Sequence, residues 1–144
     1  MRIKVIRLDR SLPLPKYETS GAVGFDLLAR QETHIEPQAI TLIPANLIIE
    51  VPKGYVLLVA SRSSTPRKKK LATPHGLGII DQDFCGPQDE IQIQVHNFST
   101  QKVIVSKGEK IAQALIIPQI RVEMEEVTEI RPVTRGGFGS TDSK

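Results

Sequence analysis

Short apolar or alternating runs, separated by turn residues, recur along the whole chain. The clearest covers residues 90–97, where Ile91, Ile93 and Val95 alternate with other residues and share one face of an extended segment. Such alternation is typical of a half-buried strand. Comparable runs cover residues 3–6, 33–36, 39–43, 46–51, 55–60, 103–105, 111–117 and 122–127. Together with residues 90–97 and the runs beside the motifs described below, they predict about ten short strands.

Turn residues and the lack of helical periodicity indicate the fold class. Ten prolines and ten glycines interrupt the runs at short intervals, which favours turns over helices. Short strands with regular turns predict an all-β sandwich or barrel. Only residues 63–71 read as a short helix, with Ser63 or Ser64 as the N-cap and Pro66 in the first turn.

A change in composition near residue 132 divides the chain. A length of 144 residues suits one domain of ordinary size, and a hydrophobic fraction of 40% is enough for a core. We expect the β domain to span residues 1–131. Residues 132–144 are rich in glycine and lack strand character, so we expect them to form a mobile C-terminal arm.

Composition and charge limit the cellular compartments and the classes of binding partner that we expect for this chain. The single cysteine, Cys85, excludes a disulfide within the chain and a zinc cage built from cysteines. Because no signal-peptide pattern and no membrane-spanning run are evident, we expect a cytoplasmic protein with no membrane partner. The net charge of +3 is modest, and no aromatic residue interleaves with the basic run 67–70. We therefore expect a solvated face there and no nucleic-acid partner.

The C-terminal arm combines glycines with residues that bind anions. Gly139 and its glycine neighbours let the backbone approach a ligand closely, Arg135 offers a planar fork of donors, and Ser140 adds a hydroxyl. Phe138 stands among these glycines, where there is no core for it to join. The arm is a candidate phosphate-binding loop, with a disordered tail as the alternative.

A second candidate is the segment 78–86, in which an apolar run ends at Asp81 and a tight turn follows. A carboxylate at a strand tip can stand beside the ring of Phe84, which is able to stack on a ligand. An ordinary β-turn with two turn-forming aspartates is the alternative.

Further polar residues lie in or next to predicted strands. Arg62, Ser63 and Ser64 stand where a strand meets the helix, which is a natural place for an anion, although an ordinary helix cap is the alternative. Gln113 lies among apolar neighbours, where its amide needs partners from the protein or from a ligand. Asp26 lies in another apolar strand, shortly after Gly24.

In their order along the chain, these five segments resemble the five motifs of the trimeric dUTPase family. The matching segments are AVGFDLLA, SRSS, GIIDQDFCG, GEKIAQ and RGGFGST, which span residues 21–141. The resemblance implies a jelly-roll-like β fold, a homotrimer and active sites at the subunit interfaces. It also implies hydrolysis of dUTP to dUMP and pyrophosphate, which keeps uracil out of DNA and supplies dUMP.

The resemblance implies a role for the polar residues of each motif. Asp81 would be the general base that activates water for attack on the α-phosphorus. Mg²⁺ would be held mainly by the phosphates, with Asp26 acting through metal-bound water or by positioning. Phosphate contacts would come from Arg62, Ser63, Ser64, Gln113, Arg135 and Ser140.

The resemblance also implies contacts to the base and the sugar. Backbone groups of Gly78, Ile79 and Ile80 would read the uracil edge, and the ring of Phe84 would pack against deoxyribose. Phe138 would stack on the uracil as the arm closes, with Gly139 next to it at the substrate.

Several positions depart from the family pattern. Phe84 stands where a tyrosine is usual, and the extra residues 87–89 lengthen the turn after the third motif. His75 stands where the family often has asparagine, and it would either face the base or be an ordinary loop histidine. None of these changes removes the base, the phosphate ligands or the stacking ring.

Two other functions fit parts of the pattern. A dCTP deaminase, or a bifunctional deaminase and dUTPase of the same superfamily, needs a glutamate that moves protons at C4 of the pyrimidine. Asp89 and Glu90 follow the third motif, and we expect neither to be placed for that step. A β-sandwich that only binds nucleotides would use the same residues and would not need Asp81 as a base.

Overall fold

The computed structural model describes residues 1–134 and Gly136. These residues form eleven strands and one short helix, which confirms the all-β prediction. The elements are β1 (Lys4–Arg7), β2 (Phe25–Leu28), β3 (Thr33–Ile35), β4 (Ile40–Pro44), β5 (Leu47–Glu50), β6 (Tyr55–Ser61), α1 (Thr65–Lys69), β7 (Leu71–Ala72), β8 (Gly78–Ile80), β9 (Gln92–Asn97), β10 (Val103–Val105) and β11 (Lys110–Pro118).

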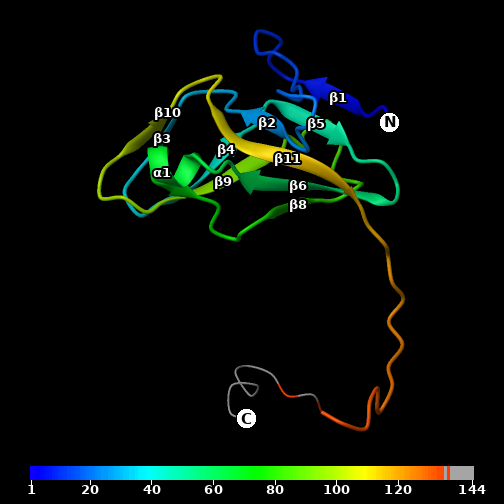
Figure 1. Cartoon of the computed structure of the whole chain (residues 1–144). Coiled ribbons are helices and arrows are strands. Elements are labelled where there is room, and N and C mark those ends of the chain that lie inside the picture. The colour runs from blue at the N-terminus through cyan, green and yellow to red at the C-terminus, as the bar shows by residue number, and fades with distance from the viewer. Residues whose placement is uncertain (135, 137–144) are drawn as a thin grey trace.

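Antiparallel pairing joins the strands into four sheets (Figure 1). The largest has the strand order β2-β11-β6-β8, a second has the order β4-β9-β7, and the pairs β1-β5 and β3-β10 complete the set. The longest ladder joins β11 to β6, from Ala112 opposite Ser61 to Pro118 opposite Tyr55. The four-stranded sheet matters most for function, because four of the five motif segments lie on its strands or directly beside them.

Aliphatic side chains build the core, as β-branched residues favour pleated sheet. Ile91, Ile93 and Val95 are at most 2% exposed, which confirms the face that their alternation predicts. Leu27 and Leu57 bring β2 and β6 into the same cluster. Among the buried residues that the structure describes, Phe25 carries the one aromatic ring.

The predicted strand over residues 122–127 is wrong. After β11 the chain leaves the sheets as a segment without helix or strand through residue 134 (Figure 1). Val122 and Val127 are 67% and 51% exposed. A strand needs a neighbouring edge to satisfy its backbone groups, and the described part of this chain presents no edge to residues 122–127.

The helix is shorter than predicted. α1 has five residues, and Ser64 occupies its N-cap position without a side-chain cap hydrogen bond. The hydroxyl of Thr65 instead donates to the Ile111 carbonyl at 2.9 Å, which ties the helix to β11. Lys70 ends the helix in the left-handed region with φ of 58°, and β7 begins at the next residue, where the sequence pattern predicts no strand.

Candidate active site

The four-stranded sheet brings Asp26, Arg62 and Gln113 together. Gln113 on β11 lies opposite Asp26 on β2 and opposite Ala60 on β6. Arg62 directly follows β6, and its Nε lies 2.8 Å from Oδ1 of Asp26. Its Nη1 donates to the Lys110 carbonyl at 3.3 Å. Three motifs that are distant in sequence therefore meet at one end of the sheet.

Lys110 is a member of this cluster that the sequence did not single out. Its Nζ lies 2.9 Å from Oδ2 of Asp26 and 2.6 Å from Oε1 of Glu18. Glu18, and after it Asp26, raise the pKa of Lys110, and Lys110 lowers the pKa of Glu18. The Asp26 side chain is only 14% exposed, so it stands as a nearly buried anchor between two cations. Lys110 lies within the motif segment GEKIAQ, so the sequence could have identified it as a site residue. Glu18 lies outside all five motif segments, and no sequence pattern identifies it.

Arg62, Ser63 and Ser64 carry hydrogen-bond donors of the kind that can bind an anion. The structure gives Arg62 Nη2 no partner among the described residues, and the Arg62 side chain is 33% exposed. Ser63 is exposed and Ser64 half-buried, and neither hydroxyl has a hydrogen-bond partner within the described part of the chain. Gln113 Nε2 donates to the Ser61 carbonyl at 3.3 Å, and its amide oxygen lies beside Gly24, 3.7 Å from the position of a Cβ added there.

Asp81 lies on a separate turn at the edge of the same sheet. It follows β8 and is exposed, and its carbonyl accepts a hydrogen bond from the Phe84 N–H at 3.3 Å. The Phe84 ring is 39% exposed. Gln82 holds the turn against the sheet, because its Nε2 donates to the Tyr55 carbonyl at 2.9 Å. A carboxylate and an exposed aromatic residue thus stand on one turn, which Gln82 ties to β6.

β8 approaches β6 closely, and this contact depends on a glycine. Gly78 lies opposite Val59, and a Cβ on Gly78 would lie 3.2 Å from the Val59 Cβ. Ile79 is exposed and Ile80 half-buried. His75, in the loop before β8, is exposed, and its Nε2 lies 3.6 Å from the position of that added Cβ.

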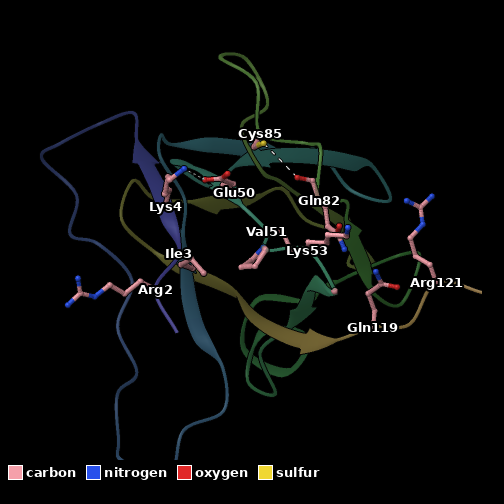
Figure 2. A pocket seen from close by; sticks show the side chains of 12 residues that line it. Arg2, Ile3, Lys4, Glu50, Val51, Lys53, Gln82, Cys85, Gln119 and Arg121 are labelled. Carbon is pink, nitrogen blue, oxygen red and sulfur yellow. Dashed lines mark hydrogen bonds and ion pairs between the residues drawn. The ribbon is translucent and has the colours of Figure 1, made fainter.

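Two neighbouring pockets flank the Asp81 turn. The one beside Asp81 has a volume of about 550 Å³ and is lined in part by Ile79 and Ile80. The other, of about 680 Å³, includes Cys85 and the Lys4–Glu50 ion pair at 2.9 Å (Figure 2). The two pockets share Gln82, Gln119 and Arg121.

Asp81 and Arg62 lie at opposite ends of β6. Ile80 faces Leu57, so Asp81 lies beside the start of β6, whereas Arg62 follows its last residue. With a rise of about 3.3 Å per residue, their backbones are about 20 Å apart along the strand. One copy of the chain therefore does not bring the candidate base and the candidate phosphate ligands together.

The two carboxylates after the third motif have structural partners. Glu90 accepts Nε and Nη2 of Arg30 at 2.8 and 2.9 Å and the Asn46 N–H at 2.8 Å. This pairing raises the pKa of Arg30. Asp89 Oδ2 accepts the Gly86 N–H at 2.6 Å. Both carboxylates therefore have structural contacts, and Glu90 is the more fully engaged of the two.

Two further observations concern metals and membranes. Within residues 1–134 and Gly136, no three His, Cys, Asp or Glu side chains gather closely enough to hold a metal ion. The same residues contain no helix of the length and apolarity needed to cross a bilayer.

The candidate residues Arg135, Phe138, Gly139 and Ser140 lie outside the described residues.

The chain is similar to known proteins over nearly its whole length. The sequence model of the dUTPase family matches residues 10–143. A deoxyuridine 5'-triphosphate nucleotidohydrolase from Hydrogenobaculum is 38% identical over 147 residues, covering 100% of both chains.

Solved structures give the same result. The dUTPase from Streptococcus mutans is 33% identical with a TM-score of 0.75, covering 81% of this chain and 97% of its own. A dUTPase variant from Staphylococcus bacteriophage 80alpha, solved with dUpNHpp, is 24% identical with a TM-score of 0.85, covering 97% and 98%. That last likeness shows the fold alone, and it confirms the jelly-roll-like prediction. Because the model of the dUTPase family matches nearly the whole length of the chain, the chain belongs to this family.

Proposed function

We propose that the chain hydrolyses dUTP to dUMP and pyrophosphate by attack of water on the α-phosphorus. The observation that carries the proposal is the full-length match to dUTPases, in a chain where Asp26, Arg62 and Gln113 form one polar cluster. The dCTP deaminase alternative is not favoured, because Asp89 and Glu90 are held by structural partners.

Asp81 is the proposed general base. An exposed carboxylate can accept a proton from the attacking water. Its position directly after an edge strand gives it a fixed backbone, and its turn is anchored by Gln82. The proton then resides on Asp81 while the new bond forms between the water oxygen and the α-phosphorus, and the pyrophosphate leaves.

The phosphates are proposed to bind at the other end of β6. Asp26 anchors Arg62 through Nε, and a guanidinium fork suits phosphate oxygens. The hydroxyls of Ser63 and Ser64 and the amide of Gln113 add neutral donors. Arg135 and Ser140 are proposed to complete the γ-phosphate end from the arm, residues 132–144.

The base and sugar are proposed to bind along β8. This strand closes the four-stranded sheet, so one of its edges carries backbone groups without a neighbouring strand among the described residues. Such groups can pair with the uracil edge, as they would with another strand. The open ring of Phe84 can cover the deoxyribose, and Phe138 is proposed to stack on the uracil with Gly139 beside it. His75 has an exposed ring near Gly78 and is a weaker candidate for contact with the base.

We also propose that the active enzyme is a homotrimer with sites shared between subunits. The distance of about 20 Å between Asp81 and Arg62 along β6 supports this, since one chain cannot present both to one triphosphate. Exposed apolar side chains in the segment after β11 also support self-association, among them Ile120 and Met124, which are 87% and 86% exposed.

Mg²⁺ is proposed to arrive on the triphosphate. Both oxygens of Asp26 already face cations, so the described residues fit a role through metal-bound water better than direct ligation. When bound, the ion would offset phosphate charge, while orientation and proton transfer remain with Arg62 and Asp81.

A substrate panel tests the proposed function. Purified protein is incubated with dUTP, UTP, dTTP and dCTP, each with and without Mg²⁺, and pyrophosphate and ammonia are measured. We expect pyrophosphate from dUTP at a rate at least about 100-fold above the other three, because a lost or unpaired polar contact in a tight site is heavily penalised. Ammonia from dCTP, or no turnover of dUTP, would contradict the proposal.

A further inference from the structure

The positive charge of the chain is concentrated around one end of β6. Arg62, Lys110 and the four basic residues at positions 67–70 lie there, together with the acidic residues Glu18, Asp26 and Glu109. These are six of the 19 basic and three of the 16 acidic residues. These nine residues together carry a formal net charge of +3.

The carboxylates in this cluster are already paired. Asp26 and Glu18 face Arg62 and Lys110, and Glu109 faces Lys69 at 2.7 Å. Lys69 also donates to the Ile104 carbonyl at 3.2 Å, which fixes it against β10. Its charge is therefore largely neutralised locally.

Arg67, Lys68 and Lys70 differ from Lys69. All three are exposed, and within the described residues none forms an ion pair or a side-chain hydrogen bond. α1 has no acidic residue in its first turn, and its basic residues lie in its last. Three exposed cations thus stand on the last turn of α1 and on its C-cap, Lys70.

These cations lie close to the proposed phosphate ligands. The Thr65 N–H bonds to the Arg62 carbonyl at 3.0 Å, so α1 starts at the phosphate-binding segment. With a helical rise of about 1.5 Å per residue, their backbones lie within about 12 Å of Arg62. That distance is about the Debye length at 0.1 M salt and well below the roughly 30 Å at 0.01 M. The cations can therefore act on an approaching anion without contacting it when bound.

We propose that Arg67, Lys68 and Lys70 form a steering surface that attracts the polyphosphate of the incoming nucleotide to Arg62. This inference rests on the proposed function, since it assumes that a triphosphate binds at Arg62. A surface of one sign next to a binding site accelerates encounter with an oppositely charged ligand and has little effect after docking. The three residues should raise the association rate constant and leave kcat unchanged.

The test is stopped-flow measurement of association between the full-length protein and a non-hydrolysable dUTP analogue with Mg²⁺, from 10 mM to 1 M salt. In the variant R67Q/K68Q/K70Q we expect the association rate constant at 10 mM salt to fall about three- to tenfold, with the difference vanishing near 1 M. Its kcat for dUTP should match that of the wild type.

A charge-retaining variant, R67K/K68R/K70R, is the matched control and should keep the wild-type rate and salt dependence. If the neutral variant associates as fast as wild type at 10 mM salt, or if the charge-retaining variant is equally slow, steering is wrong while dUTP hydrolysis stands. Binding of short duplex DNA at physiological salt that the neutral variant loses, with nucleotide association unchanged, would likewise overturn steering. A wild-type protein that neither binds the analogue nor turns over dUTP would overturn the proposed function, and steering with it.

Discussion

Arg62 Nε lies 2.8 Å from Oδ1 of Asp26, and the same carboxylate holds Lys110 Nζ at 2.9 Å through its other oxygen. One aspartate on β2 therefore fixes two cations that come from different strands of the sheet. Its position between them explains how an acidic residue can belong to the proposed phosphate site.

Replacing Asp26 by asparagine should weaken substrate binding more than it slows chemistry. Without the full negative charge, Arg62 loses its anchor and must be ordered by the substrate itself. We expect KM for dUTP to rise about tenfold, equivalent to roughly 1.4 kcal/mol, with a smaller change in kcat. Glu18→Gln is the matched control, because the Glu18 side chain is 47% exposed and its ion pair is with Lys110 rather than Arg62; its KM should stay within about twofold of wild type. Equal effects of the two substitutions would refute the anchoring role.

Replacing Asp81 by asparagine should abolish turnover and preserve binding. The amide cannot accept the proton of the attacking water, so kcat should fall about 10²- to 10⁴-fold. Titration calorimetry with a non-hydrolysable dUTP analogue checks that the site is intact, and the affinity should change little. Undiminished turnover in the Asp81→Asn variant would show that another group is the base. If the wild-type protein also fails to hydrolyse dUTP, the alternative of a module that binds nucleotides without catalysis would gain support.

The buried face of residues 91–95 could be predicted from the local alternation of apolar residues. The strand that contains them, β9, pairs with β4 and β7 of the same chain. Residues 122–127 have a strand pattern too, but pairing depends on an edge that the described residues do not supply. The Lys110–Glu18 pair joins positions 92 apart in sequence, and no periodicity reports such a contact. Asp81 and Arg62 were both found from motifs, yet their separation along β6 emerged only from the register of β8.

Gly78→Ala should loosen the edge strand that carries the proposed uracil site. The added methyl group would lie 3.2 Å from the Val59 Cβ, and the backbone of β8 must move to accept it. We expect a loss of about 1 kcal/mol in the free energy of unfolding, measured by urea denaturation at fixed protein concentration. Gly21→Ala is the control, since nothing lies within 4 Å of its added Cβ, and it should be neutral. If Gly78→Ala is equally neutral, the close packing of β8 on β6 does not constrain this position.

Glu90→Gln should destabilise the fold and leave the chemistry unchanged. Glu90 is 9% exposed and Arg30 34%, so we expect a loss of about 2 kcal/mol, below the roughly 3–5 kcal/mol of a fully buried pair. The kcat for dUTP of the folded variant should equal that of wild type. Glu50→Gln, which breaks the exposed pair with Lys4, should leave the urea midpoint unchanged. A Glu90→Gln variant that is stable and inactive would instead place Glu90 in the chemistry.

The position of the new phosphorus–oxygen bond tests the central claim most directly. Hydrolysis of dUTP in water labelled with ¹⁸O, followed by mass spectrometry of both products, locates the oxygen that came from water. Attack on the α-phosphorus predicts one ¹⁸O atom in each dUMP and none in pyrophosphate. Label in the pyrophosphate would contradict the proposed reaction.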